Sequence, residues 1–245
     1  MKPQKRSNHL EILFEDKSLV IVVKPHGMLS TSFAGSRGKS AQDVLANHFR
    51  SRGKRTIYAV HRLDRDTSGV MMFALSEQLG KRIMDDWTNM VQERTYRCVC
   101  LREPGAAPLP ESQTLKNEIA YNRYGIGFVP LGPPQKKDRT VTAISKIRVL
   151  TRGAHADLVE CDLVTGRKNQ IRIQMAHLGH PIAGDPNYGN MRDSRNRLAL
   201  HACVLAFTHP VTREALRFES REPKEFISLL GNRQGPNPSR GKRGF

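Results

Sequence analysis

Short runs of β-branched and aromatic residues recur along almost the whole chain, and they limit the fold more than any other feature of the sequence. The runs predicted to be strands are Glu11–Phe14, Leu19–Lys24, Gly69–Leu75, Thr95–Leu101, Lys116–Tyr121, Thr140–Leu150, Ala156–Leu163, Leu198–Thr208 and Ala215–Glu219. Helical periodicity is found at Ser40–Arg50, Ser76–Met90, Gly166–Leu178 and after Pro223. Strands outnumber helices and do not alternate with them regularly. We therefore expect an α+β fold, with helices flanking a mainly antiparallel mixed sheet.

The apolar runs place one folded domain between two polar ends. A chain of 245 residues can bury a full core, and we expect the domain to span residues 11–230. Residues 1–10 form a polar basic tail, and residues 231–245 are rich in Gly, Pro, Asn and Arg, which predicts disorder. Within the domain, residues 125–139 combine turn-forming and basic residues, so we expect a mobile loop there.

The chain carries 40 Lys and Arg against 23 Asp and Glu, a net charge of +17 that is spread along its length. Such a charge favours a polyanionic partner, and nucleic acid comes first because each neutralised phosphate releases counterions. A membrane surface is the alternative, but the sequence has no long apolar segment and no separate basic amphipathic helix. The charged N-terminus lacks an apolar signal core, so we expect a cytoplasmic protein.

The cysteines give no sign of a metal site. The chain has four, Cys98, Cys100, Cys161 and Cys203, with no CxxC pair and no histidine at zinc-finger spacing. Cys98 and Cys100 are two residues apart, so on a strand they would share one face. We interpret all four as small buried hydrophobic residues in a reducing compartment.

A charged segment, HRLDRDTSG, occupies residues 61–69 between the apolar runs Thr56–Val60 and Val70–Ala74. A loop between strands that carries Asp64, other charges and two hydroxyl groups is a candidate site, because loops on a rigid scaffold often hold functional side chains. Asp, Thr, Ser and Gly are also the residues of ordinary turns. The local pattern alone therefore leaves both interpretations open.

A second segment, VTGRKNQIR at residues 164–172, leads into a pattern of apolar residues at helical spacing. We expect Thr165 or Gly166 to cap this helix, which would place Arg167 and Lys168 on its first turn. Positive side chains there oppose the helix dipole, and a bound phosphate would explain them. A solvated basic helix end is the alternative.

A third segment, GHPIAGDPNYG at residues 179–189, is by itself a turn-rich loop in which Asp185 and Tyr188 are turn residues.

Together, the three segments resemble the sequence motifs of one protein family. HRLDRDTSGVMMFA resembles the HRLDxxTSG signature of the RluA-type RNA pseudouridine synthases, and GRKNQIRIQMAHLGHPIAGDPNYG resembles their GRxHQIRxHxxxxGxPIxGDxxYG block. VVKPHGM, RTY and LHACVLAFTHP are similar to the family's VVxKPxGL, KxY and LHAxxLxFxHP elements. The resemblance covers roughly residues 11–230, in the family's order.

The resemblance implies an RNA pseudouridine synthase with a catalytic cleft across the sheet and no metal or organic cofactor. It makes Asp64 the catalytic carboxylate, Arg172 the guanidinium that keeps it ionised and aimed, and Tyr96 the ring that packs on the uracil and accepts or relays the C5 proton. Arg62 would fill the gap left in the RNA when the target uridine is flipped out. Further RNA contacts are expected from Arg65, Thr67, Arg167, Lys168, Asn169 and Gln170.

Three positions depart from the resembled motifs. Histidines of the second block are replaced by Asn169 and Gln174, and the Lys of the KxY element is Arg94. Because the implied catalytic residues are retained, we still expect activity, and we interpret the substitutions as altered RNA contacts in a divergent subgroup. We expect no S4-like RNA-binding module before residue 11, so specificity would come from the catalytic domain and its loops.

Two other classes of function stay open from the sequence. A basic RNA-binding or ribosome-assembly factor could keep the fold without turnover. An RNA N-glycosidase or nuclease could use one carboxylate to activate water, although hydrolysis normally needs a second carboxylate or a metal, and Asp66 and Asp185 are the nearby candidates. For the synthase, we expect ribosomal or transfer RNA stem-loops as substrates and a monomeric enzyme.

Overall fold

The computed structural model describes residues 10–36, 38–50, 53, 56–132, 139–189 and 197–231. The two expected tails, apart from residues 10 and 231, and residues 133–138 of the expected mobile loop lie outside this part of the chain. Within it, every helix is too short or too polar to span a bilayer.

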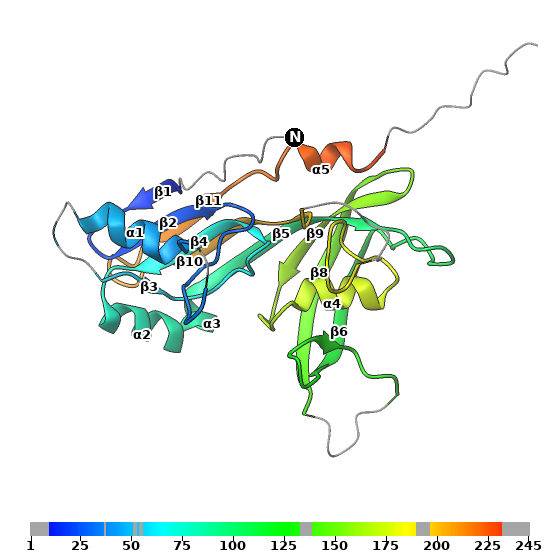
Figure 1. Cartoon of the computed structure of the whole chain (residues 1–245), viewed down its shortest axis with the longest axis horizontal. Coiled ribbons are helices and arrows are strands. Elements are labelled where there is room, and N and C mark those ends of the chain that lie inside the picture. The colour runs from blue at the N-terminus through cyan, green and yellow to red at the C-terminus, as the bar shows by residue number, and fades with distance from the viewer. Residues whose placement is uncertain are drawn as a thin grey trace, which may run out of the picture.

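One mixed sheet forms the framework of the described residues (Figure 1). Its strands are β1 (Glu11–Glu15), β2 (Leu19–Lys24), β3 (Tyr58–Ala59), β4 (Ser68–Ala74), β5 (Val91–Leu101), β6 (Ser112–Tyr121), β7 (Gly127–Phe128), β8 (Val141–Arg152), β9 (Ala156–Leu163), β10 (Leu200–Thr208) and β11 (Ala215–Glu219). The main path runs β1-β2-β4-β10-β5-β9-β8-β6-β7, with β3 beside β4 and β11 beside β10. Only β4 and β10 pair in parallel among these strands. The predicted fold class is confirmed.

Helices cover the sheet, and their bounds are α1 (Ala41–Arg50), α2 (Glu77–Asp85), α3 (Trp87–Met90), α4 (Gln170–His177) and α5 (Glu225–Ser228). β2 and β4 are buried on both faces: Val22 and Phe73 pack in the same cluster as Leu45 of α1, whereas Ile21 and Met72 pack with α2 and α3. Because neither face meets water, these strands are continuous apolar runs rather than alternating ones.

The sheet has two halves that meet at its centre. In Figure 1 the half with β1 to β4 and α1 to α3 lies on the left, and the half with β6, β8, β9 and α4 lies on the right. β10 and β5 are the adjacent strands that join them. The loop that carries Asp64 lies between β3 and β4 in the first half, and Arg172 lies on α4 in the second. Any contact between these two side chains therefore bridges the halves.

A second core underlies α4 and contains three of the cysteines. Cys98, Cys100 and Cys161 are buried with Ile171 and Met175 of α4. All four cysteines are free and buried, as predicted, and the Cys98 and Cys100 sulfurs lie 3.4 Å apart on one face of β5. The described residues contain no group of three or more His, Cys, Asp or Glu arranged to hold a metal ion.

Element boundaries differ from prediction where tertiary contacts decide them. The helix predicted over Ser76–Met90 is two helices, α2 and α3, which meet at Asp86. β5 begins at Val91 instead of Thr95, because its polar first residues pair with β10. Glu93 there forms an ion pair with Arg217 of β11, with 3.0 Å between the charged atoms. Cross-strand pairing thus extends a strand that residue propensity alone would shorten.

Gly69 shows how closely β4 and β10 approach. Its φ is +124°, and a Cβ there would lie 2.2 Å from the Ala202 carbonyl oxygen. We expect Gly69→Ala to lower the free energy of unfolding by more than about 3 kcal/mol, because it adds a clash with backbone to a strained conformation. Gly105→Ala is the control: its φ is +84° but nothing lies within 4 Å, so it should cost only about 1 kcal/mol. Urea denaturation measures both, and equal losses would contradict this account.

Candidate active site

The Asp64 loop is held through its backbone by the last residue of β2 and by the segment that follows this strand. The Lys24 ammonium donates to the Arg65 carbonyl at 3.1 Å. The Ser30 hydroxyl donates to the Leu63 carbonyl at 2.7 Å and accepts from the Leu63 N–H at 3.1 Å. Both neighbours of Asp64 are therefore fixed, and its side chain is left 36% exposed. The carboxylate has a defined direction without being buried.

Lys24 is a fully buried cation whose importance the local sequence did not reveal. Its ammonium also donates to the carbonyls of Met28 at 2.7 Å and Pro25 at 3.1 Å. Burial lowers the pKa of Lys24 to about 7, while the charges of Asp66 and Asp64 act to raise it. A lysine directly after a fully apolar strand is the available sequence signal, because such a residue must find polar partners.

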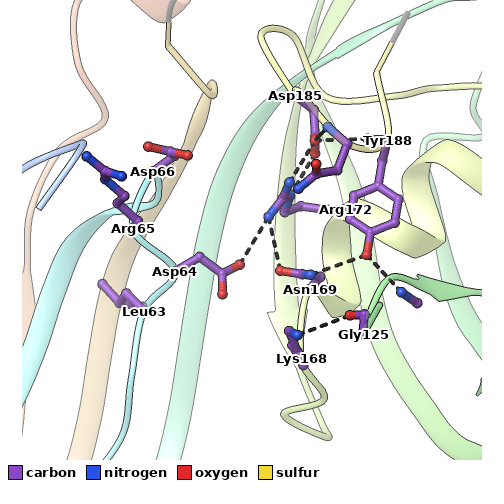
Figure 2. A network of polar contacts seen from close by, with 12 residues as sticks. Leu63, Asp64, Arg65, Asp66, Gly125, Lys168, Asn169, Arg172, Asp185 and Tyr188 are labelled. Atoms are coloured by element: carbon purple, nitrogen blue, oxygen red, sulfur yellow. Dashed lines mark hydrogen bonds and ion pairs between the residues drawn. The ribbon is translucent and has the colours of Figure 1, made fainter. Parts of the chain in front are cut away.

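Arg172 is the centre of the polar network in Figure 2. Its guanidinium donates two bonds of 2.7 Å to the Asp185 carboxylate, from Nε and Nη2. Nη1 lies 3.0 Å from Asn169 Oδ1 and 3.5 Å from Asp64 Oδ2. Burial acts to lower the pKa of Arg172, but the Asp185 bonds and charge raise it above its usual value. The predicted partner, Asp64, is thus the longer contact, and Asp185 is the main one.

Asp185 is placed with high precision by the loop around it. Its side chain is 0% exposed, and Oδ1 also accepts the N–H groups of Asn187 at 2.9 Å and Tyr188 at 3.0 Å. The preceding Gly184 has φ +73°, and a Cβ there would lie 2.0 Å from the Arg197 carbonyl oxygen. Residue type alone marks Asp185 as a turn residue. Asp185 becomes part of the site only through its hydrogen bonds with Arg172, which lies on α4.

α4 begins at Gln170, later than predicted. The side-chain oxygen of Gln170 accepts hydrogen bonds from the Thr165 hydroxyl at 2.7 Å and the Arg167 N–H at 2.9 Å. These bonds shape the loop that precedes the helix. Asn169, which directly precedes the helix, has a left-handed φ of 57°, so the helix cannot extend backwards through it. The prediction that Arg167 and Lys168 lie on the first helical turn is therefore wrong. They belong to the loop before it.

Asn169 links Arg172 to the β6–β7 hairpin. Its amide donates to the Tyr188 hydroxyl at 3.2 Å, and that hydroxyl also accepts the Gly127 N–H at 3.1 Å. The Arg172 guanidinium lies 5.0 Å from the centre of the Tyr188 ring. Figure 2 shows Asn169 and Asp64 linked to the same nitrogen of Arg172, with the Tyr188 ring on the side of the guanidinium away from Asp64. The side-chain oxygen of Asn169 and the ring of Tyr188 thus hold the arginine toward the first half of the sheet.

Tyr96 lies on β5, between the two halves. It contacts both the α1 core and the α4 core, and its strand neighbours are Ala202 and Cys161. Burial raises the pKa of Tyr96 to about 12; the Arg94 charge acts against this shift and the Asp64 charge adds to it. The side chain is therefore a neutral phenol at physiological pH, with a ring held rigidly in the site.

A cavity of about 930 Å³ runs between the halves, as the predicted cleft requires. The predicted site residues that line it are Arg62, Asp64, Thr67, Tyr96, Arg167, Lys168, Asn169, Gln170 and Arg172. Thr67 and Gln170 line it while being 2% and 3% exposed, so they shape the wall more than they present polar atoms. Arg65 does not line the cavity: it donates to the Gly27 carbonyl at 3.3 Å, and Figure 2 shows it directed away from Asp64.

The three departures from the resembled motifs lie in different places. Asn169 and Arg94 line the cavity. Gln174 is 1% exposed and bonds to the Ser145 hydroxyl at 2.8 Å and the Asn117 side chain at 2.9 Å. Gln174 therefore forms hydrogen bonds within the core, and its interpretation as an altered RNA contact is wrong.

Comparisons with known proteins agree with this geometry. Residues 18–177 match the family model described as RNA pseudouridylate synthase. The tRNA pseudouridine synthase C of Vibrio cholerae is 33% identical over 84% of this chain and 88% of its own length. The ribosomal large subunit pseudouridine synthase D of Zymomonas mobilis is 29% identical over 90% of this chain and 72% of its own length.

The solved structure of human RNA pseudouridylate synthase domain containing 4 matches with a TM-score of 0.71 at 21% identity, over 90% of this chain and 91% of that one, and shares the fold. Fold and motifs together define an isomerase of the pseudouridine synthase class. The chain belongs to the RNA pseudouridylate synthase family.

Lys24 should make stability depend on pH. The folded protein loses this proton near pH 7, whereas the unfolded chain keeps it up to about 10.5, so the unfolded state binds more protons in that window and stability rises with pH. Relative to Lys24→Met, we expect the wild-type free energy of unfolding to gain up to about 1.4 kcal/mol per pH unit. Urea denaturation at pH 7 and 9 measures this, with exposed Lys17→Met as control. Parallel changes in wild type and Lys24→Met would refute it.

Proposed function

We propose that this enzyme converts specific uridines of structured ribosomal or transfer RNA to pseudouridine, with Asp64 as the essential carboxylate. One observation carries the assignment. The Asp64 carboxylate is at the cavity wall, with its loop fixed on both sides and an Arg172 guanidinium 3.5 Å away. Relatives named for a ribosomal and for a transfer RNA both match over most of this chain, which supports either class of substrate.

The isomerisation breaks the bond between C1′ and N1, turns the uracil, joins C5 to C1′ and releases the C5 proton, while N1 takes up a proton. Asp64 starts the cleavage as nucleophile or base, which requires its ionised form. Arg172 supplies a positive charge that faces it, and Asp185 and Asn169 keep that charge in place. A carboxylate that is already aligned needs little reorganisation when the substrate arrives.

Tyr96 retains and orients the free uracil during its rotation. A rigid aromatic ring on β5 offers a stacking face, and its neutral phenol can relay the C5 proton without becoming a phenolate. Arg62 is exposed and lines the cavity beside Asp64. We assign it to the space that the flipped uridine leaves in the RNA, a step that costs a few kcal/mol and favours uridines in loops.

The geometry disfavours a hydrolytic alternative. The Asp185 carboxylate accepts hydrogen bonds from the Arg172 guanidinium and from two backbone N–H groups. It is therefore engaged in the fold and is not placed to activate a water molecule. Asp66 points away from Asp64 in Figure 2. Neither provides the second carboxylate that an N-glycosidase or nuclease would use. A non-catalytic RNA-binding factor would have no need for the fixed Asp64 loop.

Asp64→Asn tests the proposal directly. With C5-tritiated RNA from cells that lack this protein, wild type should release tritium to water, and Asp64→Asn should be at least about 10²-fold slower because it removes the reacting carboxylate. Asp66→Asn, which removes a neighbouring charge directed elsewhere, should keep most of the rate. Full activity of Asp64→Asn would show that Asp64 is not the reacting carboxylate, whereas binding of RNA without any release by wild type would leave the non-catalytic factor. Free uracil among the products would indicate hydrolysis.

Tyr96→Phe separates stacking from proton transfer. The phenylalanine ring should keep KM for RNA close to wild type, and loss of the hydroxyl should lower kcat by about 10²-fold. Because the pKa of Tyr96 is raised to about 12, kcat of the two enzymes should depend on pH in the same way between pH 7 and 9. A rise in this range that is present in wild type and absent in Tyr96→Phe would show that a phenolate acts as the base.

A further inference from the structure

The cavity extends beyond the residues that the reaction needs. Besides the Asp64 region it is lined by Met84, Trp87, Thr88, Arg94 and Val164, none of which has a role in the isomerisation proposed above. Its volume of about 930 Å³ is near the upper end of the roughly 300–1,000 Å³ common for small-molecule sites. A single flipped uridine would leave this part of the cavity unfilled.

Trp87 is the most prominent side chain in this region. The break between α2 and α3 at Asp86 places it at the cavity wall, where its ring lies 5.0 Å from the His61 ring at 39°. His61 is itself fixed, because its Nε2 accepts the Met72 N–H at 3.0 Å. Burial, together with the Arg94 charge, lowers the pKa of His61 to about 4, so the ring is neutral. Trp87 is thus a rigid aromatic surface with an uncharged support.

The surroundings of Trp87 suit a nucleotide. Met84 and Val164 are 49% and 50% exposed, which is unusual for apolar side chains at the wall of a cavity. The Arg94 guanidinium is held by the carbonyls of Leu163 at 3.1 Å and Val164 at 3.0 Å. No carboxylate of the described residues forms an ion pair with Arg94. Its charge is therefore fixed in position and available to a phosphate.

We infer that Trp87, with Met84, Val164 and Arg94, forms a second nucleotide site that binds an unpaired base next to the target uridine. The base stacks on Trp87 between the exposed apolar side chains, and its phosphate meets Arg94. Stacking accepts any base, so the site selects single-stranded context more than sequence. This inference rests on the proposed function, because it assumes an RNA whose target uridine enters at Asp64.

The single tryptophan of the chain makes the site observable, because fluorescence emission then reports on Trp87 alone. The full-length Asp64→Asn variant is titrated with a short single-stranded oligouridylate and, separately, with uridine monophosphate. The oligonucleotide should quench the emission at saturation, and the mononucleotide should quench it much less. Saturated oligonucleotide binding without quenching would overturn the inference.

Variants then measure the contribution of the stack. Trp87→Ala should raise Kd for the oligouridylate about ten-fold, and Trp87→Phe less, because a smaller ring still stacks. Phe33→Ala removes an aromatic side chain that is 66% exposed and outside the cavity lining, and it should leave Kd unchanged. Equal affinity of Trp87→Ala and wild type would overturn the site.

If Trp87→Ala does not fold, Arg94→Met tests the second nucleotide site instead, because this variant keeps the tryptophan. It should bind more weakly and with a shallower dependence on salt, because one phosphate contact is lost. Unchanged affinity and salt dependence would refute the site. Tritium release separates this inference from the proposed function: release by wild type with unaltered kinetics in Trp87→Ala removes only the second site, whereas no release from any RNA removes the synthase itself.

Discussion

The ion pair between Arg172 and Asp185 is the interaction on which the rest of the site depends. Both side chains are almost fully enclosed, 7% and 0% exposed, and a buried charge is tolerated only when it is paired and hydrogen-bonded. Two bonds of 2.7 Å meet that need on one edge of the guanidinium. The remaining nitrogen, Nη1, donates to Asn169 and also faces Asp64 across the cavity. One half of the sheet thus presents a positioned cation to the other half.

The opposite half achieves the same precision by different means. The Asp64 loop is fixed mainly through its main chain, because Lys24 and Ser30 donate hydrogen bonds to its backbone carbonyls. Backbone bonding leaves the side chain of Asp64 partly exposed and able to meet a substrate. The site therefore combines an immobile arginine with a carboxylate whose main chain is fixed and whose oxygens are accessible. Such a division suits a reaction in which the carboxylate must react and the guanidinium must not.

The local sequence predicted strands and helices well where the pattern of apolar residues matches the burial of the element. β2 and β9 have the predicted bounds, because their apolar runs coincide with strands buried in the sheet. The motifs that resemble the synthase family predicted Asp64, Tyr96 and Arg172 as site residues, and all three line the same cavity. Prediction failed where distant contacts decide: Gln170 delays the start of α4, pairing with β10 lengthens β5, and Asp185 gains its role only from a residue on another element. Those contacts depend on the three-dimensional arrangement, which no local pattern contains.

The central place of β10 has a consequence for how the enzyme matures. This strand is inserted between β4 and β5 and, with β5, joins the two halves along the main path of the described strands, yet it comes from residues 200–208. During synthesis the N-terminal half can collapse early, but the two walls of the cleft cannot take their positions relative to each other until β10 has left the ribosome. A nascent chain therefore lacks a complete cleft until residues 200–208 have been synthesised.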